Sequence, residues 1–283
     1  MQKAVPSFEY VKLPDERLNI VDMISLVGRA AIPATLFYDV DATWAEMIRE
    51  TLSNAGHRVT ITALLIKAIA IAQRNHPTSR TQMLPNGKLV QFNNIEAQFT
   101  VERFINDQPG LFFGSIKQPD TKSLIDITEE LRIYGSEPIE KVPQLEIEHR
   151  FSKYPRWLRQ VILFFGMRYP SIRLRYMGAT FGLSSLGKYG ARNVISPSVI
   201  TSMFCIGEVE RRPKVVGDTI TISPQLSIVL NFDHRVIDGA AAARFMADII
   251  GLLEGGLETY IADEIGFNGS NQSTRDGSLT STK

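Results

Sequence analysis

The stretch from Ala63 to Asn75 constrains the fold most, because its pattern is helical and almost free of polar side chains. Thr60 or Thr62 precedes it as a cap, and His76-Pro77 ends it. A helix that is apolar on nearly its whole surface is expected to be buried. The chain has 283 residues, of which 44% are hydrophobic, so one sheet-based domain of this length can bury such a helix.

Hydrophobic periodicity predicts that strands and helices alternate around this buried helix. The other predicted helices lie within residues 11–28, 43–53, 124–132, where Ser123 is the cap, and 239–253. The predicted strands are 34–41, 88–92, 97–104, 110–116, 180–186, 198–209, 219–223 and 226–232. The strand at 88–92 is expected to form a hairpin that turns near Asn93-Asn94, and Gly217-Asp218 is expected to form a tight turn.

The domain organisation is expected to be simple. The sequence has no internal repeat and no Pro/Ala/Gly-rich linker, so residues 1–265 are interpreted as a single α/β domain. Residues 266–283 are rich in Gly, Ser, Thr and Asn and almost lack apolar side chains, which predicts a disordered tail.

Charge and cysteine content exclude several classes of protein. Lys and Arg number 31 and Asp and Glu 30, so the basic excess of a dedicated nucleic-acid binder is missing. Cys205 is the only cysteine, which excludes an intramolecular disulfide and a multi-cysteine zinc site, and no metal is expected. The N-terminus lacks the apolar run of a signal peptide, so a cytoplasmic location is expected.

One segment, Phe151 to Tyr176, has an unusual composition: six basic residues, no acidic residue and seven aromatic residues. Its longest stretch without a polar side chain is seven residues, Val161 to Met167, too short to span a bilayer, which takes about 20 residues. The simplest interpretation is an amphipathic helix or helix pair whose aromatic side chains pack on the sheet while the arginines are solvated. A lid over a substrate channel, an anion-binding rim for a phosphorylated cofactor and a membrane-surface contact are the alternatives.

The residues with the clearest chemical potential lie in the stretch Ser227–Ala240, where an apolar strand ends at His234 and a helix of small residues follows. Histidine titrates near neutral pH and can take a proton from a thiol or hydroxyl, although a histidine at a strand end is also a common structural residue. Asp238 could hold the loop by pairing with an arginine. Gly239 permits close backbone approach.

Two motifs resemble those of a known family. Residues 233–239, Asp-His-Arg-Val-Ile-Asp-Gly, and residues 178–187, Gly-Ala-Thr-Phe-Gly-Leu-Ser-Ser-Leu-Gly, resemble the signatures of the catalytic acyltransferase domain of 2-oxoacid dehydrogenase complexes, which shares its fold with chloramphenicol acetyltransferase. The similarity extends from about Leu13 to Leu257 through further segments at 39–41, 59–76, 110–131, 206–207 and 212–213.

This resemblance implies a fold and a set of catalytic residues. The expected fold is a chloramphenicol-acetyltransferase-like two-layer α/β sandwich with a mixed sheet, in a homotrimer with active sites between subunits. By match to the motifs, His234 is the general base, Ser184 stabilises the oxyanion, and Asp238 fixes the loop through an arginine, for which Arg17 is the candidate.

The expected activity is transfer of an acyl group, in the first instance acetyl, from a coenzyme A thioester to a small-molecule hydroxyl or thiol. The resemblance starts close to Met1, so we expect a chain without a lipoyl domain of its own, similar to stand-alone members of tetronate biosynthesis. Gly114 replaces a usual proline, and the segment from about Lys141 to Arg175 is longer than the family's connection, which puts the acceptor in doubt. The resemblance assigns no residues to coenzyme A binding.

Three alternatives remain open. The chain could act on a lipoyl domain of another protein, or it could be a non-catalytic assembly protein with the same fold. A peptide-synthetase condensation domain ranks last, because it has a second histidine where this chain has Asp233, and is much longer.

Overall fold

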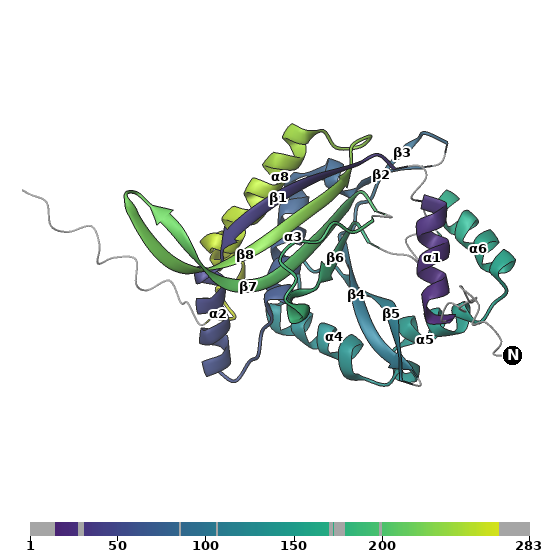
Figure 1. Ribbon diagram of the computed structural model, residues 1–283, viewed down its shortest axis with the longest axis horizontal. Helices are drawn as coiled ribbons and strands as arrows, with labels where there is room; N and C mark the ends of the chain where they lie inside the picture. Colours follow the sequence, from purple (N-terminus) through teal and green to yellow (C-terminus); the bar gives the residue numbers. More distant parts are fainter. Residues whose placement is uncertain are drawn as a thin grey trace, which may run out of the picture.

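A mixed six-stranded sheet forms the centre of the computed structural model (Figure 1). β6 is parallel to both of its neighbours, β4 and β7, and the other strand pairs are antiparallel. The structure describes residues 15–27, 31–84, 86–105, 107–169, 172, 179–197 and 200–265, and the predicted tail lies outside them. In spatial order the strands are β1 (Pro33–Asp41), β8 (Thr219–Asp233), β7 (Ser202–Val216), β6 (Phe181–Ser185), β4 (Glu96–Ile105) and β5 (Gln108–Lys117).

Four helices share one hydrophobic core with this sheet, which makes the two layers. They are α2 (Thr43–Asn54), α3 (Ile61–Asn75), α4 (Leu124–Ser136) and α8 (Gly239–Gly251). Shorter helical turns connect or follow them: η1 (Pro77–Arg80), η2 (Ile139–Lys141), η3 (Gly187–Tyr189), η4 (Leu252–Gly256) and α9 (Glu258–Ile261).

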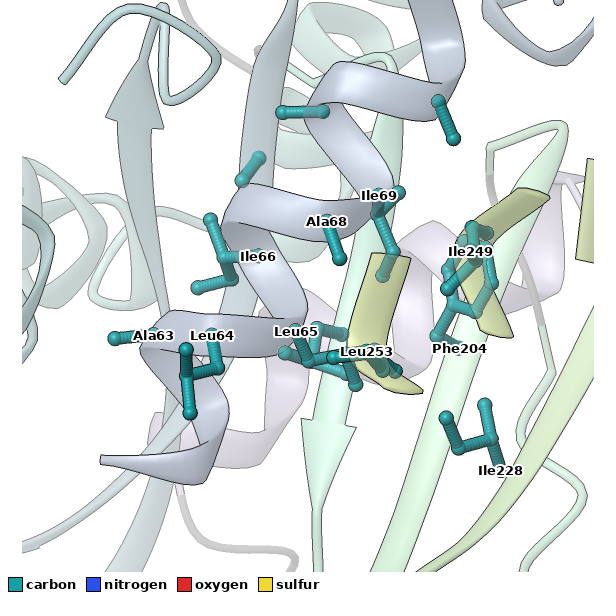
Figure 2. Close-up of a cluster of buried hydrophobic side chains, with 14 of the residues drawn as sticks. Ala63, Leu64, Leu65, Ile66, Ala68, Ile69, Phe204, Ile228, Ile249 and Leu253 are labelled. Carbon is teal, nitrogen blue, oxygen red and sulfur yellow. The ribbon is translucent and has the colours of Figure 1, made fainter. Parts of the chain in front are cut away.

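The buried helix predicted from the sequence is α3, at the centre of this core. The hydroxyl of Thr60 accepts a hydrogen bond from the Ala63 amide at 3.1 Å, which identifies Thr60 as the cap. Side chains of α3 face Phe204 and Ile228 on the sheet and Ile249 on α8 (Figure 2). α3 thus fixes the sheet and α8 relative to each other, and with them the loop that joins β8 to α8.

Three helices form a separate group beside β5 (Figure 1). α1 (Asp15–Val27) contacts β5 and also packs against α5 (Pro143–Ser152) and α6 (Arg156–Arg168). α6 is the outermost of the three in this view.

Two predicted strand arrangements are wrong. The arm at 88–92 does not form a hairpin with the strand at 97–104: β3 (Leu89–Gln91) pairs with β2 (Thr81–Met83) in a separate two-stranded sheet. The ranges 219–223 and 226–232 are one strand, β8, that continues through Pro224. β1 ends at Asp41, opposite Gln225, and the next amide, Ala42, donates to the Pro224 carbonyl at 2.9 Å. Pro224 thus lies where the β1 ladder ends, and its missing N–H is tolerated there.

The expected orientation of the 151–176 segment is also wrong, as far as its described residues show. Aromatic side chains of α6, such as Trp157 and Phe164, are exposed instead of packed on the sheet. Arg159, expected in solvent, is buried against Asp22 of α1. The buried carboxylate needs a cationic partner, and this ion pair turns the charged side of α6 inward. Residues 170–171 and 173–178 lie outside the described part.

Candidate active site

His234 lies directly after β8, in the loop that leads to α8. Its backbone amide donates to the Ile32 carbonyl at 2.8 Å, and its ring is 5.7 Å from the ring of Phe232, centroid to centroid. The side chain is exposed in the single chain. The imidazole is therefore held at the end of a rigid strand and is open to a substrate or a neighbouring subunit.

The residues on either side of the imidazole form a local ion pair. Arg235 Nε donates to Asp233 Oδ1 at 2.9 Å, and the Arg235 amide donates to the same oxygen at 3.1 Å. Burial raises the pKa of Asp233, but the hydrogen bonds and charge of Arg235 outweigh it and leave that pKa below its ordinary value. The carboxylate form is favoured, and its bonds to the amide and side chain of Arg235 link the residues on both sides of His234.

Asp238 caps the N-terminus of α8. Its Oδ1 accepts a hydrogen bond from the Ala241 amide at 2.7 Å. In the described part of the chain it forms no ion pair with Arg17, which lines a pocket beside α1 instead. Within one chain, Asp238 positions the His234 loop by anchoring the helix that follows, and among the described residues the expected contact with Arg17 is not formed.

Ser184 is buried near the end of β6, on the strand next to β7. Its Oγ accepts a hydrogen bond from Thr100 Oγ1 at 3.1 Å. A hydroxyl can accept one hydrogen bond and donate another, so Ser184 can turn its proton toward a second acceptor while it keeps this contact. The arrangement suits a hydroxyl that donates to a developing oxyanion.

The structure does not bring Ser184 and His234 together within one chain. Ser184 pairs with Cys205 of β7, and Cys205 pairs with Val229 of β8, five residues before His234. At strand spacing the two residues are about 16 Å apart along the sheet and about 10 Å across it, about 19 Å in total. A substrate carbonyl cannot contact both residues of a single chain.

An apolar pocket of about 250 Å³ lies between α1 and the sheet. Thr100, the hydrogen-bond partner of Ser184, lines it. Ile20 and Met23 of α1 form one wall, Gly182 and Thr100 belong to the sheet, and Arg17 adds a positive charge. The sequence analysis missed Thr100 and this pocket. Alternation in the strand at 97–104 places Thr100 on a different face from its apolar neighbours, but no sequence pattern indicated that β4 lies next to β6.

Gly114 on β5 packs against the ring of Phe99 on β4, which also lines this pocket. A Cβ added to Gly114 would lie 2.2 Å from the Phe99 ring, so the ring occupies the space that a larger residue would need. Gly114 therefore belongs to the packing of β4 against β5.

The described residues contain no group of three or more His, Cys, Asp and Glu side chains placed to hold a metal ion. Within the same ranges, no helix is long and apolar enough to cross a membrane.

Comparison with known families decides the relationship. The family model of the 2-oxoacid dehydrogenases acyltransferase (catalytic domain) matches residues 6–140 and 173–261, well over half of the chain. The chain belongs to this family.

Relatives within the acyltransferase family are components of pyruvate dehydrogenase complexes. The dihydrolipoyllysine-residue acetyltransferase component of Zymomonas mobilis is 29% identical over 73% of this chain and 40% of its own length. Component 2 of the mitochondrial complex of Arabidopsis thaliana is 26% identical over 88% of this chain and 42% of its own length. The chain thus spans less than half the length of these relatives.

Solved structures of the family confirm the fold expected from the resemblance. The dihydrolipoamide acetyltransferase of Azotobacter vinelandii aligns with a TM-score of 0.64 at 24% identity, over 91% of this chain and 98% of that one. A probable dihydrolipoamide acetyltransferase of Listeria monocytogenes aligns with a TM-score of 0.63 at 21% identity, over 88% and 95%.

The family model leaves residues 141–172 unmatched. This stretch contains α5 and α6 and coincides with the segment that the sequence analysis identified as longer than the family's usual connection. The two helices are therefore an addition to what the acyltransferase family shares.

Proposed function

We propose that this chain is an acyltransferase that exchanges an acyl group between the thiol of coenzyme A and a dihydrolipoyl group carried by another protein. The family match with His234, Asp238 and Ser184 all present at its motifs is the observation that carries the proposal. The Azotobacter vinelandii enzyme was studied for the roles of a serine, a histidine and, four residues later, an asparagine in its catalytic mechanism. His234 and Asp238 have the same spacing.

The proposed acceptor differs from the small-molecule hydroxyl or thiol favoured by the sequence analysis. The relatives are named as dihydrolipoyllysine-residue acetyltransferases, which favours the alternative with a lipoyl domain. Coenzyme A remains the other substrate.

The residues supply a base and an oxyanion donor. His234 takes the proton of the attacking thiol, whose sulfur forms a bond to the thioester carbonyl carbon. Ser184 donates a hydrogen bond to the negative oxygen of the tetrahedral intermediate, an interaction that can contribute about 2.7–4 kcal/mol to the barrier. When the intermediate collapses, the departing thiolate takes the proton back from His234.

This mechanism requires at least two copies of the chain. Because Ser184 and His234 of one chain are about 19 Å apart by strand geometry, the serine of one subunit has to face the histidine of another. We propose a homotrimer with active sites between its subunits, as the resemblance implies. We also propose that the protein is located in the cytoplasm.

The test uses the full chain with acetyl-coenzyme A and dihydrolipoamide, and detects the S-acetyl product by mass spectrometry. Wild type, His234→Ala and Ser184→Ala are compared at equal concentration. We expect losses of about 10²–10⁴-fold for His234→Ala and about 10²–10³-fold for Ser184→Ala. Leu89→Ser, an exposed site on β3, is the matched control and should keep full activity.

A parallel panel of small alcohols separates the alternatives. Turnover with alcohols and none with dihydrolipoamide would contradict the proposed acceptor and restore the small-molecule reading. Turnover that persists in His234→Ala would contradict the assigned base. No turnover and no binding of coenzyme A would favour a non-catalytic assembly protein.

A further inference from the structure

Helix α6 exposes an apolar face to solvent and buries Arg159 on the opposite face, the reverse of an ordinary surface helix. Trp157, Val161, Phe164 and Phe165 follow the spacing i, i+4, i+7, i+8 and form one face, here called the apolar stripe. Trp157 is 66% exposed and Phe164 54% exposed, and the other two are also exposed. A surface helix normally turns such a face toward the core.

An ion pair between Arg159 and Asp22 joins the opposite face of α6 to α1. Arg159, Leu163 and Gly166 are buried there. Arg159 Nε and Nη2 donate to Asp22 Oδ2 at 2.9 and 2.7 Å, and its Nη1 donates to the Tyr154 carbonyl at 2.6 Å. The ion pair fixes the rotation of α6, so the apolar stripe cannot turn inward without breaking it.

α6 lies at the outer edge of the molecule in this view, with α1 between it and the sheet (Figure 1). The rings of Phe164 and Phe165 pack edge to face at 5.6 Å, and Phe165 stacks on Tyr169 at 6.2 Å. A contiguous exposed apolar surface of this kind marks a binding site for another surface. Because the family model does not match this stretch, the surface is an addition to the common catalytic fold.

The charges around the apolar stripe identify the kind of partner. Lys153 and Arg156 lie at the N-terminal end of α6, where Arg156 Nε is also 3.3 Å from Asp22 Oδ1, and Arg168 lies at its C-terminal end. The sequence has no Asp or Glu from His149 through Gly207. Aromatic side chains on one face of a short helix, with cations at its ends, are what an anionic lipid surface binds. The 13 residues of α6 extend about 20 Å, so this helix lies on a bilayer surface and does not span it.

Pairing of two apolar stripes with each other fits this surface less well. Two α6 helices that pair through their apolar stripes with two-fold symmetry bring the same cations together, Arg156 near Arg168 in the antiparallel case. Like charges at such a contact oppose pairing. Anionic headgroups neutralise them instead.

We propose that the apolar stripe of α6 and the cations at the ends of this helix bind the protein to anionic phospholipid surfaces. This inference is independent of the proposed acyl transfer, because the stripe contains none of the residues assigned to that reaction. α6 is attached to the body through Asp22, so the whole catalytic domain follows it to the membrane.

The experiment measures co-sedimentation of the full chain with vesicles of phosphatidylcholine alone or mixed equally with phosphatidylglycerol. We expect binding to the mixed vesicles that falls as salt rises. The double variant Phe164→Ser/Phe165→Ser should lower the partition coefficient about tenfold or more. Lys153→Gln/Arg168→Gln should weaken binding to mixed vesicles only.

Phe104→Ser is the matched control, because Phe104 is an equally exposed aromatic residue on β4, and it should bind like wild type. No binding to mixed vesicles, or equal loss in Phe104→Ser, would overturn the proposal. Sedimentation velocity without lipid provides the remaining check. If the Phe164→Ser/Phe165→Ser variant forms a smaller assembly than wild type, the stripe is a contact between copies and the proposal is wrong.

Discussion

The ion pair between Asp22 and Arg159 predicts the stability of the α1–α5–α6 group. Both side chains are almost completely buried, at 2% and 3% exposure. Arg159 uses all three nitrogens of its guanidinium: two bind Asp22, and Nη1 binds backbone carbonyls of Ser152 and Tyr154. The Asp22→Ala substitution leaves this buried cation without its carboxylate.

The expected cost follows from the two hydrogen bonds to a charged group. At about 1.5–3 kcal/mol each they predict a loss of about 3–6 kcal/mol, in line with the roughly 3–5 kcal/mol found when one partner of a buried pair is removed. Arg159→Met should cost less, because Arg156 Nε still lies 3.3 Å from Asp22 and compensates its charge. Asp22→Leu/Arg159→Met removes both charges and should stay within about 1.5 kcal/mol of wild type.

Tryptophan fluorescence during urea unfolding measures this group directly. The chain has two tryptophans, Trp44 in α2 and Trp157 in α6, so Trp44→Phe leaves a probe on α6 alone. All variants are compared at one protein concentration, because assembly adds to apparent stability. A loss below about 1 kcal/mol for Asp22→Ala, or a double variant that loses the sum of the single variants, would refute the reasoning.

Three further predictions concern other contacts. Gly114→Ala should cost about 1–3 kcal/mol, because its Cβ would meet the Phe99 ring, and Phe99→Leu should relieve most of the loss in thermal unfolding. Asp238→Ala should cost about 1 kcal/mol through the lost α8 cap, whereas Asp238→Asn should keep stability, as measured by urea midpoints. Burial raises the pKa of Glu148 to about 8 from 4.5, so the folded state holds a proton that the unfolded chain releases. Its contribution to stability is complete below pH 4.5 and is lost as pH rises through about 8, with a slope of at most about 1.4 kcal/mol per pH unit. Glu148→Gln should remove that decline in pH-dependent unfolding.

Local elements were predictable where periodicity and capping agree. The buried helix α3 and the turn at Gly217-Asp218 between β7 and β8 follow from residue types, whereas the choice of Thr60 over Thr62 as the cap comes from the structure. The β2–β3 pairing was missed because short strands gain their partner through tertiary contacts, which a local pattern does not contain.

The candidate site was predictable as motifs and not as geometry. His234 and Ser184 were found because their neighbours resemble known signatures. Their separation became clear only from the strand order, since it depends on which strand lies between β6 and β8. Asp238 shows the same limit: it was predicted to pair with an arginine, which depends on tertiary placement, and the structure shows it as the N-cap of α8.

The orientation of α6 shows that sequence periodicity does not determine the direction in which a helix face points. The spacing of Trp157, Val161 and Phe164 determines that they share a face, but the direction of that face depends on Asp22, which is 137 positions from Arg159. A buried ion pair is about neutral against apolar packing, whereas each large apolar side chain left in water forgoes about 1.5–3 kcal/mol. The pair therefore explains how α6 is held and does not offset the exposure of the apolar stripe. Covering the apolar stripe would recover the burial free energy that its side chains forgo in water. An anionic lipid surface covers the stripe without bringing like charges together.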